Sequence, residues 1–489
     1  MNDRLVRRWL CSIPISFAQF FLSNTISGRS AFLFALTLIA PFPAGLAVLG
    51  AAVASWSFSI GGPARRMVAR GLPGVNGALI GYSWILFPQV APMWQISLTV
   101  IGAALSSAAL VPVLGFLRRK HSHLAPFSIP YLIVVYATIP CLILGGLYDR
   151  NFARGWHLYL ANRPMEAEEV FAEIAPMNQR IAAYRESGIG WARFRQNDFD
   201  GAQRAFAMAV QELPHLADAQ DGLGWAAISQ NDSVTAERAF REALRIDPTM
   251  GDAWNGLGWI AYRRGDAMES VRAFRNAAIW CPFFPDTWEG LRRAMALSGH
   301  SPTDRIDAIH AFLAARAGRS AWFINSRQML AWGFIFLGIC MFSRRSGLMV
   351  VIALAGAIAV RSMFAAASMD LDFAYNLIAL IMALSGQYVI LDGRSIVWVG
   401  GLTIGMSVIW PGFASGMADL GIPVLALPFN AAILLTLLIF SSVRALRGLI
   451  VPLEIALEGP TKASSWWWRR EAAEGCWKRI RHPDSRPSV

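Results

Sequence analysis

Charged residues are scarce in this chain. Of its 489 residues only 16% are Asp, Glu, Lys or Arg, whereas 55% are hydrophobic. A soluble protein of this length needs more polar side chains to cover its surface, so the composition excludes an ordinary soluble globular protein. Apolar stretches long enough to cross a bilayer occur toward both ends of the chain. The sequence therefore predicts an all-α, polytopic membrane protein.

Patterned cysteine, histidine and nucleotide-binding motifs are lacking too. The five cysteines show no paired spacing, so they predict neither a disulfide framework nor a zinc site. His121 and His123 flank Ser122 without a metal-spaced partner or a nearby carboxylate, and they are interpreted as loop residues. No nucleotide-binding loop and no acidic proton relay within the apolar spans is apparent. We expect no enzyme activity, no catalytic residue, no metal and no cofactor.

Basic residues, by contrast, are in excess and give a formal net charge of +12. They lie in short loops and tails between apolar spans, where they orient a membrane protein, so nucleic acid is not an expected partner. Arg4, Arg7 and Arg8 precede an apolar stretch that Pro14 interrupts, and we expect this segment to be retained. The tail 448–489 mixes tryptophan with positive charge, which suits the anionic inner surface of a membrane.

The apolar stretches form two sets of five predicted spans. They lie near residues 30–46, 44–61, 73–88, 92–116 and 130–148, and near 328–343, 347–365, 373–390, 395–414 and 428–446. Basic residues occupy alternate loops, whereas loops 41–43 and 88–92 carry no charge and are expected to face outward. Five spans per half give the halves opposite orientations. We expect a cytoplasmic (inner) membrane protein with both termini cytoplasmic and residue 149 outside.

The two halves share short phrases. Residues 124–131 read Leu-Ala-Pro-Phe-Ser-Ile-Pro-Tyr, and residues 422–429 read Ile-Pro-Val-Leu-Ala-Leu-Pro-Phe. Asn76 and Asn376 precede them in similar surroundings, 300 positions apart. Each Pro-rich phrase is too short to span and is predicted to be a re-entrant half-helix buried in protein. Such a duplication, with proline-interrupted segments at matching places, indicates a transport pathway between the halves.

A polar insert with another pattern separates the halves. Three sets of residues recur at intervals of 34: Gly190, Gly224 and Gly258; Phe206, Phe240 and Phe274; and Pro214, Pro248 and Pro282. This period resembles tetratricopeptide (TPR) repeats, helix pairs that bury their apolar faces only by stacking on neighbours. The predicted repeats are 183–216, 217–250 and 251–284. A capping helix to about residue 299 follows, and the stretch from Trp156 to Pro176 is a candidate degenerate fourth repeat.

The chain thus divides into a first membrane half at 1–148, an α-solenoid of TPR helix pairs at 149–319, a second membrane half at 320–447, and the tail. In TPR proteins the first helices tend to line a concave, peptide-binding groove. The predicted groove residues are Trp191, Asp221, Trp225, Asn255, Trp259 and Tyr262. Their partner would be an unknown extracytoplasmic protein or peptide. Alternatively, the three tryptophans wedge between repeats as packing.

Apart from the insert, the chain resembles the urea transporter family of channel-like proteins, whose signature reads Leu-Pro-x-x-Thr-x-Pro-Phe once per half. Both Pro-rich phrases carry this resemblance, as do residues 18–24 and 71–79. It covers roughly residues 15–148 and 320–447. The resemblance implies five spans and one re-entrant helix per half, a pore at the pseudo-twofold axis, and a homotrimer in the bilayer.

The resemblance also implies the solute pathway, which uses a ladder of oxygens and aromatic pairs that sandwich a flat solute. The matching positions are Gln19, Leu22, Val75, Asn76, Leu79, Phe127, Ser128, Pro130, Tyr131, Tyr375, Asn376, Pro423, Ala426, Pro428 and Phe429. The signature threonine is replaced by Ser128 in one half and by Ala426 in the other. The pore-lining phenylalanine before the asparagine is Val75 or Tyr375. One half of the site is therefore better kept than the other.

Two functions remain open from the sequence. The kept Ser128, Gln19 and Asn76 favour a channel for urea or a similar small neutral amide, with a TPR domain that recruits a partner or covers the pore mouth. Ala426 and Val75 favour a non-transporting membrane scaffold whose degenerate channel anchors a periplasmic TPR domain. Loss of one hydrogen-bonding partner weakens recognition of a polar solute, because the solute then enters a site with an unpaired group.

Overall fold

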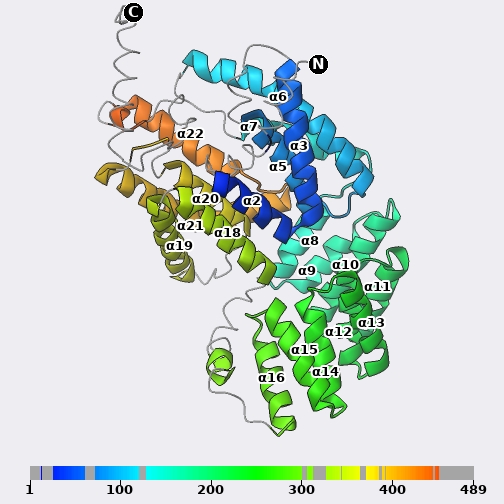
Figure 1. The fold of residues 1–489 in the computed structure, drawn as a ribbon. Coiled ribbons are helices and arrows are strands. Elements are labelled where there is room, and N and C mark those ends of the chain that lie inside the picture. The colour runs from blue at the N-terminus through cyan, green and yellow to red at the C-terminus, as the bar shows by residue number, and fades with distance from the viewer. Residues whose placement is uncertain are drawn as a thin grey trace, which may run out of the picture.

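A computed structural model gives the fold (Figure 1). It describes residues 13, 26–60, 72–120, 128–299, 306–311, 326–342, 344–363, 371–384, 388–390, 392–443 and 446–450. Within these ranges the regular structure is helical, apart from one isolated antiparallel bridge between Val389 and Ile450. The predicted all-α class is confirmed.

Ten apolar helices correspond one to one with the ten predicted spans. In the first half they are α2 (Ile26–Ile39), α3 (Pro41–Ile60), α5 (Leu72–Tyr82), α6 (Pro92–Lys120) and α7 (Ile129–Leu144). In the second they are α18 (Ser326–Phe342), α19 (Arg344–Met363), α20 (Leu371–Leu384), α21 (Gly393–Asp419) and α22 (Leu427–Ser442). Short 3₁₀ turns lie at Ser83–Leu86 and Arg447–Leu449. Among the described residues, α3, α6 and α21 are long and apolar enough to cross a membrane, so five spans per half stays a prediction.

The helices nearest the Pro-rich phrases are short. At about 1.5 Å per residue, α5 is about 16 Å long and α7 about 24 Å, against a bilayer core of about 30 Å. Residues 422–426 are not helical, and both α7 and α22 begin only at the last three residues of their phrases. Proline disfavours helical backbone in the residue before it, which keeps the start of the second phrase extended. The described helix of the second phrase is therefore only the first turn of α22, and residues 124–127 of the first phrase lie outside the described residues.

Close backbone contact fixes α5 against α3. A Cβ on Gly77 would lie 2.1 Å from the carbonyl oxygen of Gly50, and one on Gly81 would lie 2.1 Å from that of Leu46. Only glycine allows this approach. Gly77 therefore has a packing role, and the tight crossing places the recurring Asn76 beside it in the buried interior.

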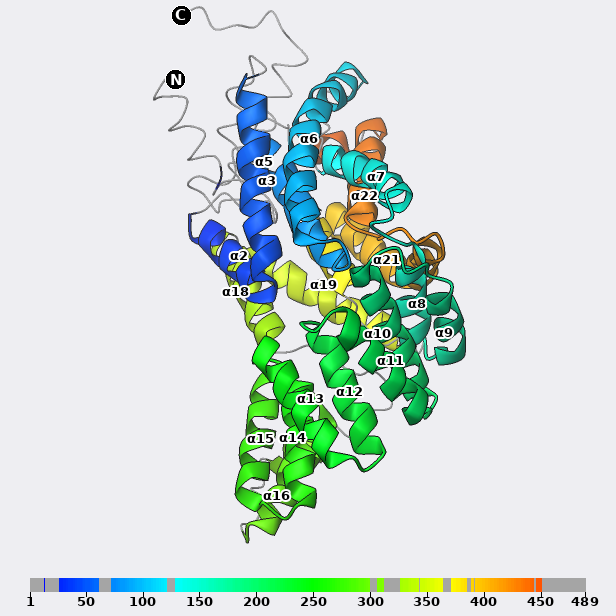
Figure 2. The same cartoon turned by 90° about the vertical axis from the view of Figure 1, so that its right-hand side faces the viewer.

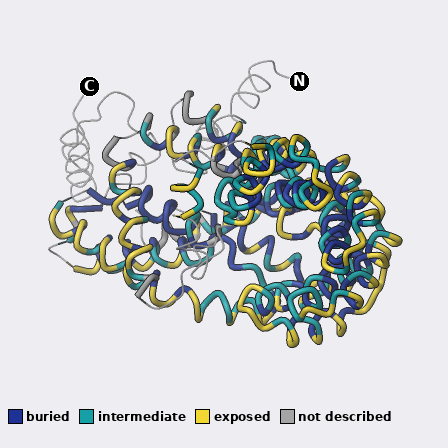
Figure 3. Tube along the Cα trace, turned by 90° about the horizontal axis from the view of Figure 1, so that it is seen from below, coloured by how far each residue is buried: buried dark blue, intermediate teal, exposed yellow. Residues whose placement is uncertain are grey.

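The insert forms stacked helix pairs below the apolar helices in the view of Figures 1 and 2. Its helices are α8 (Asn151–Leu160), α9 (Pro164–Ala172), α10 (Gln179–Arg195), α11 (Phe199–Glu212), α12 (Ala217–Ser229), α13 (Ser233–Ile246), α14 (Gly251–Arg263), α15 (Ala267–Trp280) and α16 (Pro285–Leu297). They wind in an arc, with exposed residues along the outer rim (Figure 3). The domain limits at 149 and 319 stay a prediction.

Each repeat phenylalanine sits in a notch between two glycines. A Cβ on Gly224 or Gly256 would approach the Phe240 ring to 2.5 or 2.3 Å, and Gly190 with Gly222 frames Phe206 in the same way. The rings of Phe206, Phe240 and Phe274 are fully buried as a result. Phe171 occupies an equivalent notch between Gly155 and Gly188, so α8 and α9 pack as a further repeat ahead of the three with regular spacing.

The turns within the pairs repeat as well. Asn197, Asn231 and Gly265 have positive φ angles of 63°, 63° and 83°, and an aspartate follows each of them. The side chains of Asp198, Asp232 and Asp266 each accept the backbone N–H of the third residue of the next helix, at 2.9 to 3.0 Å. Asparagine and glycine tolerate the left-handed backbone, and aspartate caps free helix N–H groups. This turn starts every second helix at the same place.

The insert contacts the membrane half directly. Arg180 donates to the carbonyl oxygen of Pro88 at 2.6 Å, and the Asn178 side chain donates to that of Gly146 at 3.2 Å. The Tyr148 hydroxyl, at the end of the first membrane half, donates to the carbonyl oxygen of Gly421 at 3.3 Å, next to the second Pro-rich phrase, and a Cβ on Gly421 would meet Arg150 at the start of the insert. The uncharged loop at Pro88 and the phrase at Gly421 therefore lie on the same side as the repeats.

Candidate solute pathway and repeat groove

The two recurring asparagines make the same contact in both halves. The side-chain oxygen of Asn76 accepts the backbone N–H of Tyr131 at 3.0 Å, and that of Asn376 accepts the N–H of Phe429 at 3.1 Å. Both N–H groups lie in the first turn of a helix, where no carbonyl within the helix can accept them. Asn76 is 1% exposed and Asn376 fully buried, so neither N–H has water as an alternative. The asparagines are thus internal caps of α7 and α22.

Asn376 also contacts the residue before the N-cap of α22. Its Nδ2 donates to the carbonyl oxygen of Leu425 at 2.7 Å. Leu425 has a φ angle of 51°, which a leucine rarely adopts. The hydrogen bond supports the carbonyl of this strained residue, which immediately precedes Ala426, the N-cap of α22.

Ser128 and Ala426 occupy equivalent places. Ser128 is the N-cap of α7 with φ −96° and ψ 19°, and Ala426 is the N-cap of α22 with φ −93° and ψ 16°. Their carbonyl oxygens accept the N–H groups of Leu132 and Asn430, at 3.0 and 3.1 Å. The signature threonine position is therefore the N-cap of a helix in both halves, with a hydroxyl in one half only.

The two helix starts meet through Asn430. Its Nδ2 donates to the Ser128 hydroxyl at 2.7 Å, and its Oδ1 accepts the Ser128 N–H at 3.3 Å. Ser128 is 6% exposed and Asn430 only 2%. A second bond between the halves comes from the Tyr136 hydroxyl, which approaches the carbonyl oxygens of Pro423 and Val424 at 3.2 and 3.0 Å.

This meeting point has a defined electrostatic character. The N-terminus of a helix carries about half a positive charge, and here the N-termini of α7 and α22 come together. Partial positive charge repels cations and attracts a carbonyl oxygen. The place where the halves meet therefore favours a neutral or acceptor group over ammonium-like ions.

The remaining predicted pathway residues are placed as follows. Val75, Leu79, Pro130, Tyr131, Ala426 and Phe429 are buried, whereas Tyr375, Pro423 and Pro428 are partly buried. Gln19, Leu22 and Phe127 lie outside the described residues. The structure brings Asn76 to Tyr131 and Asn376 to Phe429, and it brings Ser128 to Asn430. The pathway role of each residue stays a prediction.

The predicted groove residues are tied into the repeats. The partly buried rings of Trp191, Trp225 and Trp259 stand edge-on to Phe206, Phe240 and Phe274, with centroids 5.2, 5.5 and 5.2 Å apart. Tyr262 meets Trp259 edge-on at 5.8 Å. Asp221 is 3% exposed and Asn255 fully buried. Each tryptophan ring packs on the phenylalanine of its own repeat, and both wedging between repeats and ligand binding in the groove stay predictions.

Three aspartates at intervals of 34 face these residues. Asp218 accepts the Ser187 hydroxyl at 2.6 Å and the Trp191 N–H at 3.1 Å, and Asp286 accepts from Asn255 and Trp259, both at 2.8 Å. In the middle repeat the equivalent pair is Asp221 and Asp252. Both members of this pair are acids, whereas each flanking pair combines an aspartate with a hydrogen-bond donor, Ser187 or Asn255.

Both aspartates of the middle pair, Asp221 and Asp252, have raised pKa values. Burial raises the pKa of Asp252 to about 6, helped by the charges of Asp218 and Asp286. Burial and the neighbouring charges of Asp252 and Asp218 raise the pKa of Asp221 well above its ordinary value. Within the described part of the chain, the Asp221 Oδ1 has no hydrogen-bond partner. A proton on Asp221 would let it donate as Ser187 and Asn255 do.

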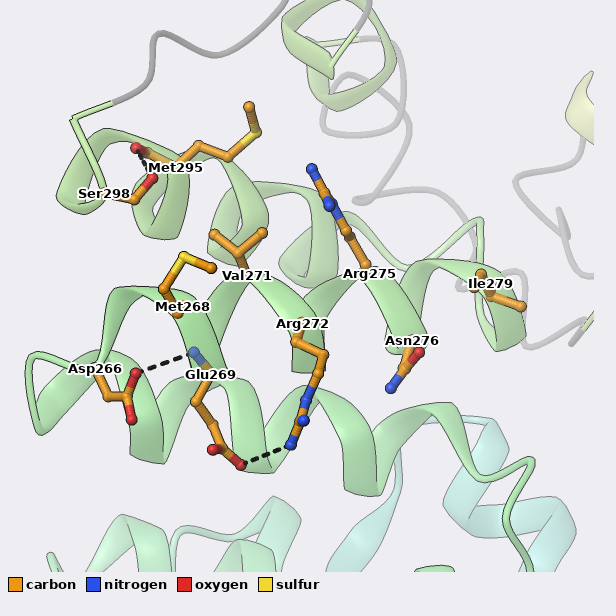
Figure 4. A pocket seen from close by; sticks show the side chains of 10 residues that line it. All are labelled: Asp266, Met268, Glu269, Val271, Arg272, Arg275, Asn276, Ile279, Met295 and Ser298. Atoms are coloured by element: carbon orange, nitrogen blue, oxygen red, sulfur yellow. Dashed lines mark hydrogen bonds and ion pairs between the residues drawn. The ribbon is translucent and has the colours of Figure 1, made fainter.

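A hollow of about 790 Å³ lies at the far end of the array, on α15 and α16 (Figure 4). It is lined by Asp266, Glu269, Arg272 and Arg275 together with apolar residues such as Met268 and Met295. Glu269 accepts from Arg272 at 3.4 Å, and Asp266 accepts the backbone N–H of Glu269 at 3.0 Å. No predicted groove residue lines this hollow, so the two surfaces are separate.

Several of these residues were missed from the sequence. Asp218, Asp252 and Asp286 follow the 34-residue period and could have been found from it. Asn430 is a polar residue directly after the second signature, inside an otherwise apolar run, which is a usable signal. Tyr136 carries no such signal. In the described part of the chain, no group of three or more His, Cys, Asp or Glu side chains could hold a metal ion.

Fold and site together define a membrane-integral transport protein with an inserted protein-interaction domain. The chain belongs to the urea transporter family, whose sequence pattern matches residues 15–178 and 288–441. The tetratricopeptide repeat pattern matches residues 188–251 and 222–285, so the insert is a TPR domain. Both families are in general non-enzymatic.

Solved structures similar to this chain cover about a third of it. The crystal structure of MamA is 15% identical with a TM-score of 0.28 and covers 34% of this chain and 94% of that chain. A thermophilic TPR protein of Thermus thermophilus is 14% identical with a TM-score of 0.30, covering 37% of this chain and 95% of that one. No curated protein matches the sequence.

Proposed function

We propose that this protein is a channel for urea or a similar small neutral amide, with its TPR domain on the extracytoplasmic side of the inner membrane. The carrying observation is the pair of asparagine caps, Asn76 to Tyr131 and Asn376 to Phe429. They fix two short helices so that both N-termini converge between the halves. In this proposal both chain termini are cytoplasmic and three copies associate in the bilayer.

The proposed mechanism is passive. Urea is neutral and planar, and it must keep its hydrogen bonds after shedding water, since an unpaired buried polar group costs about 1–3 kcal/mol. The Ser128 hydroxyl would offer such a bond at the meeting point, and the converging N-termini would exclude cations. The TPR domain contacts the loops at Pro88 and Gly146 and would bind a protein or peptide at the end of the pathway that these loops face.

Stopped-flow light scattering on proteoliposomes tests this proposal. Urea, formamide, glycerol and water are compared for the parent, for Ser128→Leu, and for a matched control, Ser97→Leu. Ser97 is exposed on the apolar helix α6, and its hydroxyl bonds only within that helix. The proposal expects fast urea equilibration that Ser128→Leu abolishes and Ser97→Leu leaves intact. Urea flux equal to that of empty liposomes contradicts it.

The second candidate is a non-transporting scaffold that anchors the TPR domain. It is favoured by one observation: both polar groups of Ser128 are bonded to Asn430, and Ala426 offers no hydroxyl in exchange. A scaffold predicts no flux for any solute in the parent or in any pathway variant, together with stable capture of a partner by the TPR domain.

A further inference from the structure

Asn430 is an unexpected link between the two halves of the protein. Its carboxamide is fully engaged: Nδ2 donates to the Ser128 hydroxyl at 2.7 Å and to the Ala426 carbonyl oxygen at 2.6 Å. Its Oδ1 accepts the Ser128 backbone N–H at 3.3 Å. With 2% of its surface exposed, the side chain fills the space between the two helix N-caps.

The internal duplication gives this residue a direct comparison. Ser128 and Ala426 are equivalent N-caps, 298 positions apart, and the same offset pairs Leu132 with Asn430. The first half thus has a hydroxyl at the cap and an apolar residue one turn later. The second half has no hydroxyl at the cap and a carboxamide one turn later. The carboxamide approaches from the half that lacks the hydroxyl and bonds to the hydroxyl of the other half.

A carboxamide has the same chemistry as the proposed solute. It is a planar carbonyl with an NH₂ group, so it donates and accepts hydrogen bonds as one half of a urea molecule does. Nδ2 and Oδ1 engage both polar groups of Ser128 at once, which is the arrangement a small amide would adopt there. A solute beside Ser128 and the carboxamide of Asn430 therefore compete for the same hydrogen-bonding groups.

The geometry points to Asn430 as a tethered amide that occupies the solute position beside Ser128, so that a small neutral amide passes only when this side chain turns away. This inference rests on the proposed channel function and specifies its gate. It makes Asn430 the residue that sets the rate and size limit of passage. Leu132, in the same place of the first half, has no group that could compete.

Flux through Asn430→Ala and Asn430→Leu is the first test, with urea, formamide and acetamide as solutes. One hydrogen bond corresponds to a rate factor of about 5 and two to about 30. Asn430→Ala is therefore expected to raise amide flux by about 5-fold to 30-fold, most for acetamide. Asn430→Leu restores the bulk that the first half carries at Leu132 and is expected to give no increase. Unchanged or lower flux in Asn430→Ala, in a parent that conducts, overturns the inference.

Thiol labelling provides a test that needs no flux. Ser128→Cys is made alone, with Asn430→Ala, and with Asn430→Leu. The folded proteins are alkylated with iodoacetamide, a small neutral amide, and the rate at position 128 is read from the peptide that carries this residue, isolated after labelling. Asn430→Ala, which removes both the carboxamide and its bulk, is expected to raise the rate at least about fivefold, whereas Asn430→Leu, which keeps the bulk, is expected to leave it unchanged. Equal rates in all three overturn the inference. Faster labelling with no flux in any variant supports the occupied site and rejects the proposed channel.

Discussion

Asn376 accepts the backbone N–H of Phe429 at 3.1 Å and thereby caps a helix that begins in the interior of the protein. Asn376→Ala leaves this N–H and the Leu425 carbonyl oxygen without a side-chain partner, and a buried unsatisfied group costs about 1–3 kcal/mol. We expect a lower free energy of unfolding, measured by thermal denaturation in detergent with tryptophan fluorescence. Asn76→Ala removes the equivalent cap of α7 and is expected to lower the free energy of unfolding as well.

Thr138→Ala is the control for this pair. Thr138 lies on α7, and its hydroxyl donates to the Val134 carbonyl oxygen within the same helix at 2.7 Å. That carbonyl keeps its helical partner when the hydroxyl is removed, so the change is expected to be within about 0.5 kcal/mol of the parent. Equal losses in all three variants would show that the asparagine contacts carry no special weight.

Gly421 links the repeat domain to the second Pro-rich phrase. Its φ angle is 68°, and a Cβ there would lie 2.1 Å from the Cβ of Arg150 at the start of the insert. Gly421→Ala is therefore expected to separate the phrase from the insert and to lower thermal stability by about 1–3 kcal/mol. Gly416→Ala, in α21 with no atom within 4 Å of its Cβ position, is expected to be neutral or slightly stabilising. Faster proteolysis near residue 421 in Gly421→Ala alone confirms the contact.

The buried acid pair of the middle repeat predicts a pH dependence. A carboxyl whose pKa is raised by folding binds its proton more tightly in the folded state, so folding is favoured as the pH falls. For Asp252 this window runs from about 6 down to the ordinary value of 3.8, and Asp221 shifts in the same direction. Hydrogen exchange of peptides from α12 to α14, corrected for its intrinsic pH dependence, is expected to show more protection at pH 5 than at pH 7.

Asp221→Asn imitates the next repeat, in which Asn255 donates to Asp286 at 2.8 Å. We expect this variant to stabilise the repeats at pH 7 by about 1–3 kcal/mol, because a donor replaces a second carboxylate. It should also flatten the pH dependence of exchange. Asp200→Asn, an exposed position on α11, controls for the change in net charge. A destabilising effect of Asp221→Asn would mean that the acid pair already shares its hydrogen bonds in another way.

The glycine notch around Phe240 is tested by Gly224→Ala. The new Cβ would come within 2.5 Å of the ring, which has no free space to move into because it is fully buried. Overpacking of this kind costs about 1–3 kcal/mol. Ser229→Ala, an exposed position on the same helix, is expected to be nearly neutral. Loss of exchange protection in α12 and α13 with Gly224→Ala, and not with Ser229→Ala, checks the prediction.

The sequence predicted the positions of periodic features, but it did not predict which apolar helices span the membrane. The 34-residue interval located Phe206, Phe240 and Phe274 because each repeat must present the same buried face to its neighbours. The matching asparagines 300 positions apart indicated a duplicated site, and both proved to cap a helix. Hydropathy located ten apolar helices, but it could not distinguish a helix that spans from one that begins within the membrane, since both are equally apolar.

Contacts between the halves could not be predicted. The bond from Asn430 to Ser128 joins residues that no period or motif relates, because Leu132 stands at the equivalent place in the other copy. The Tyr136 contact with Pro423 and Val424 likewise depends on how two helices approach in space. Sequence symmetry indicates where the halves correspond, whereas the departures from symmetry decide how they are joined.

The bond between Ser128 and Asn430 also has a consequence for biosynthesis. The two residues are 302 positions apart, and a ribosome that adds about 5–20 residues per second needs about 15–60 s to make the intervening chain. During that time the repeats are made, and Ser128 at the start of α7 has no Asn430 to bond to. The contact between the halves therefore forms only after Asn430 has been made, and a chain terminated before residue 430 cannot form it.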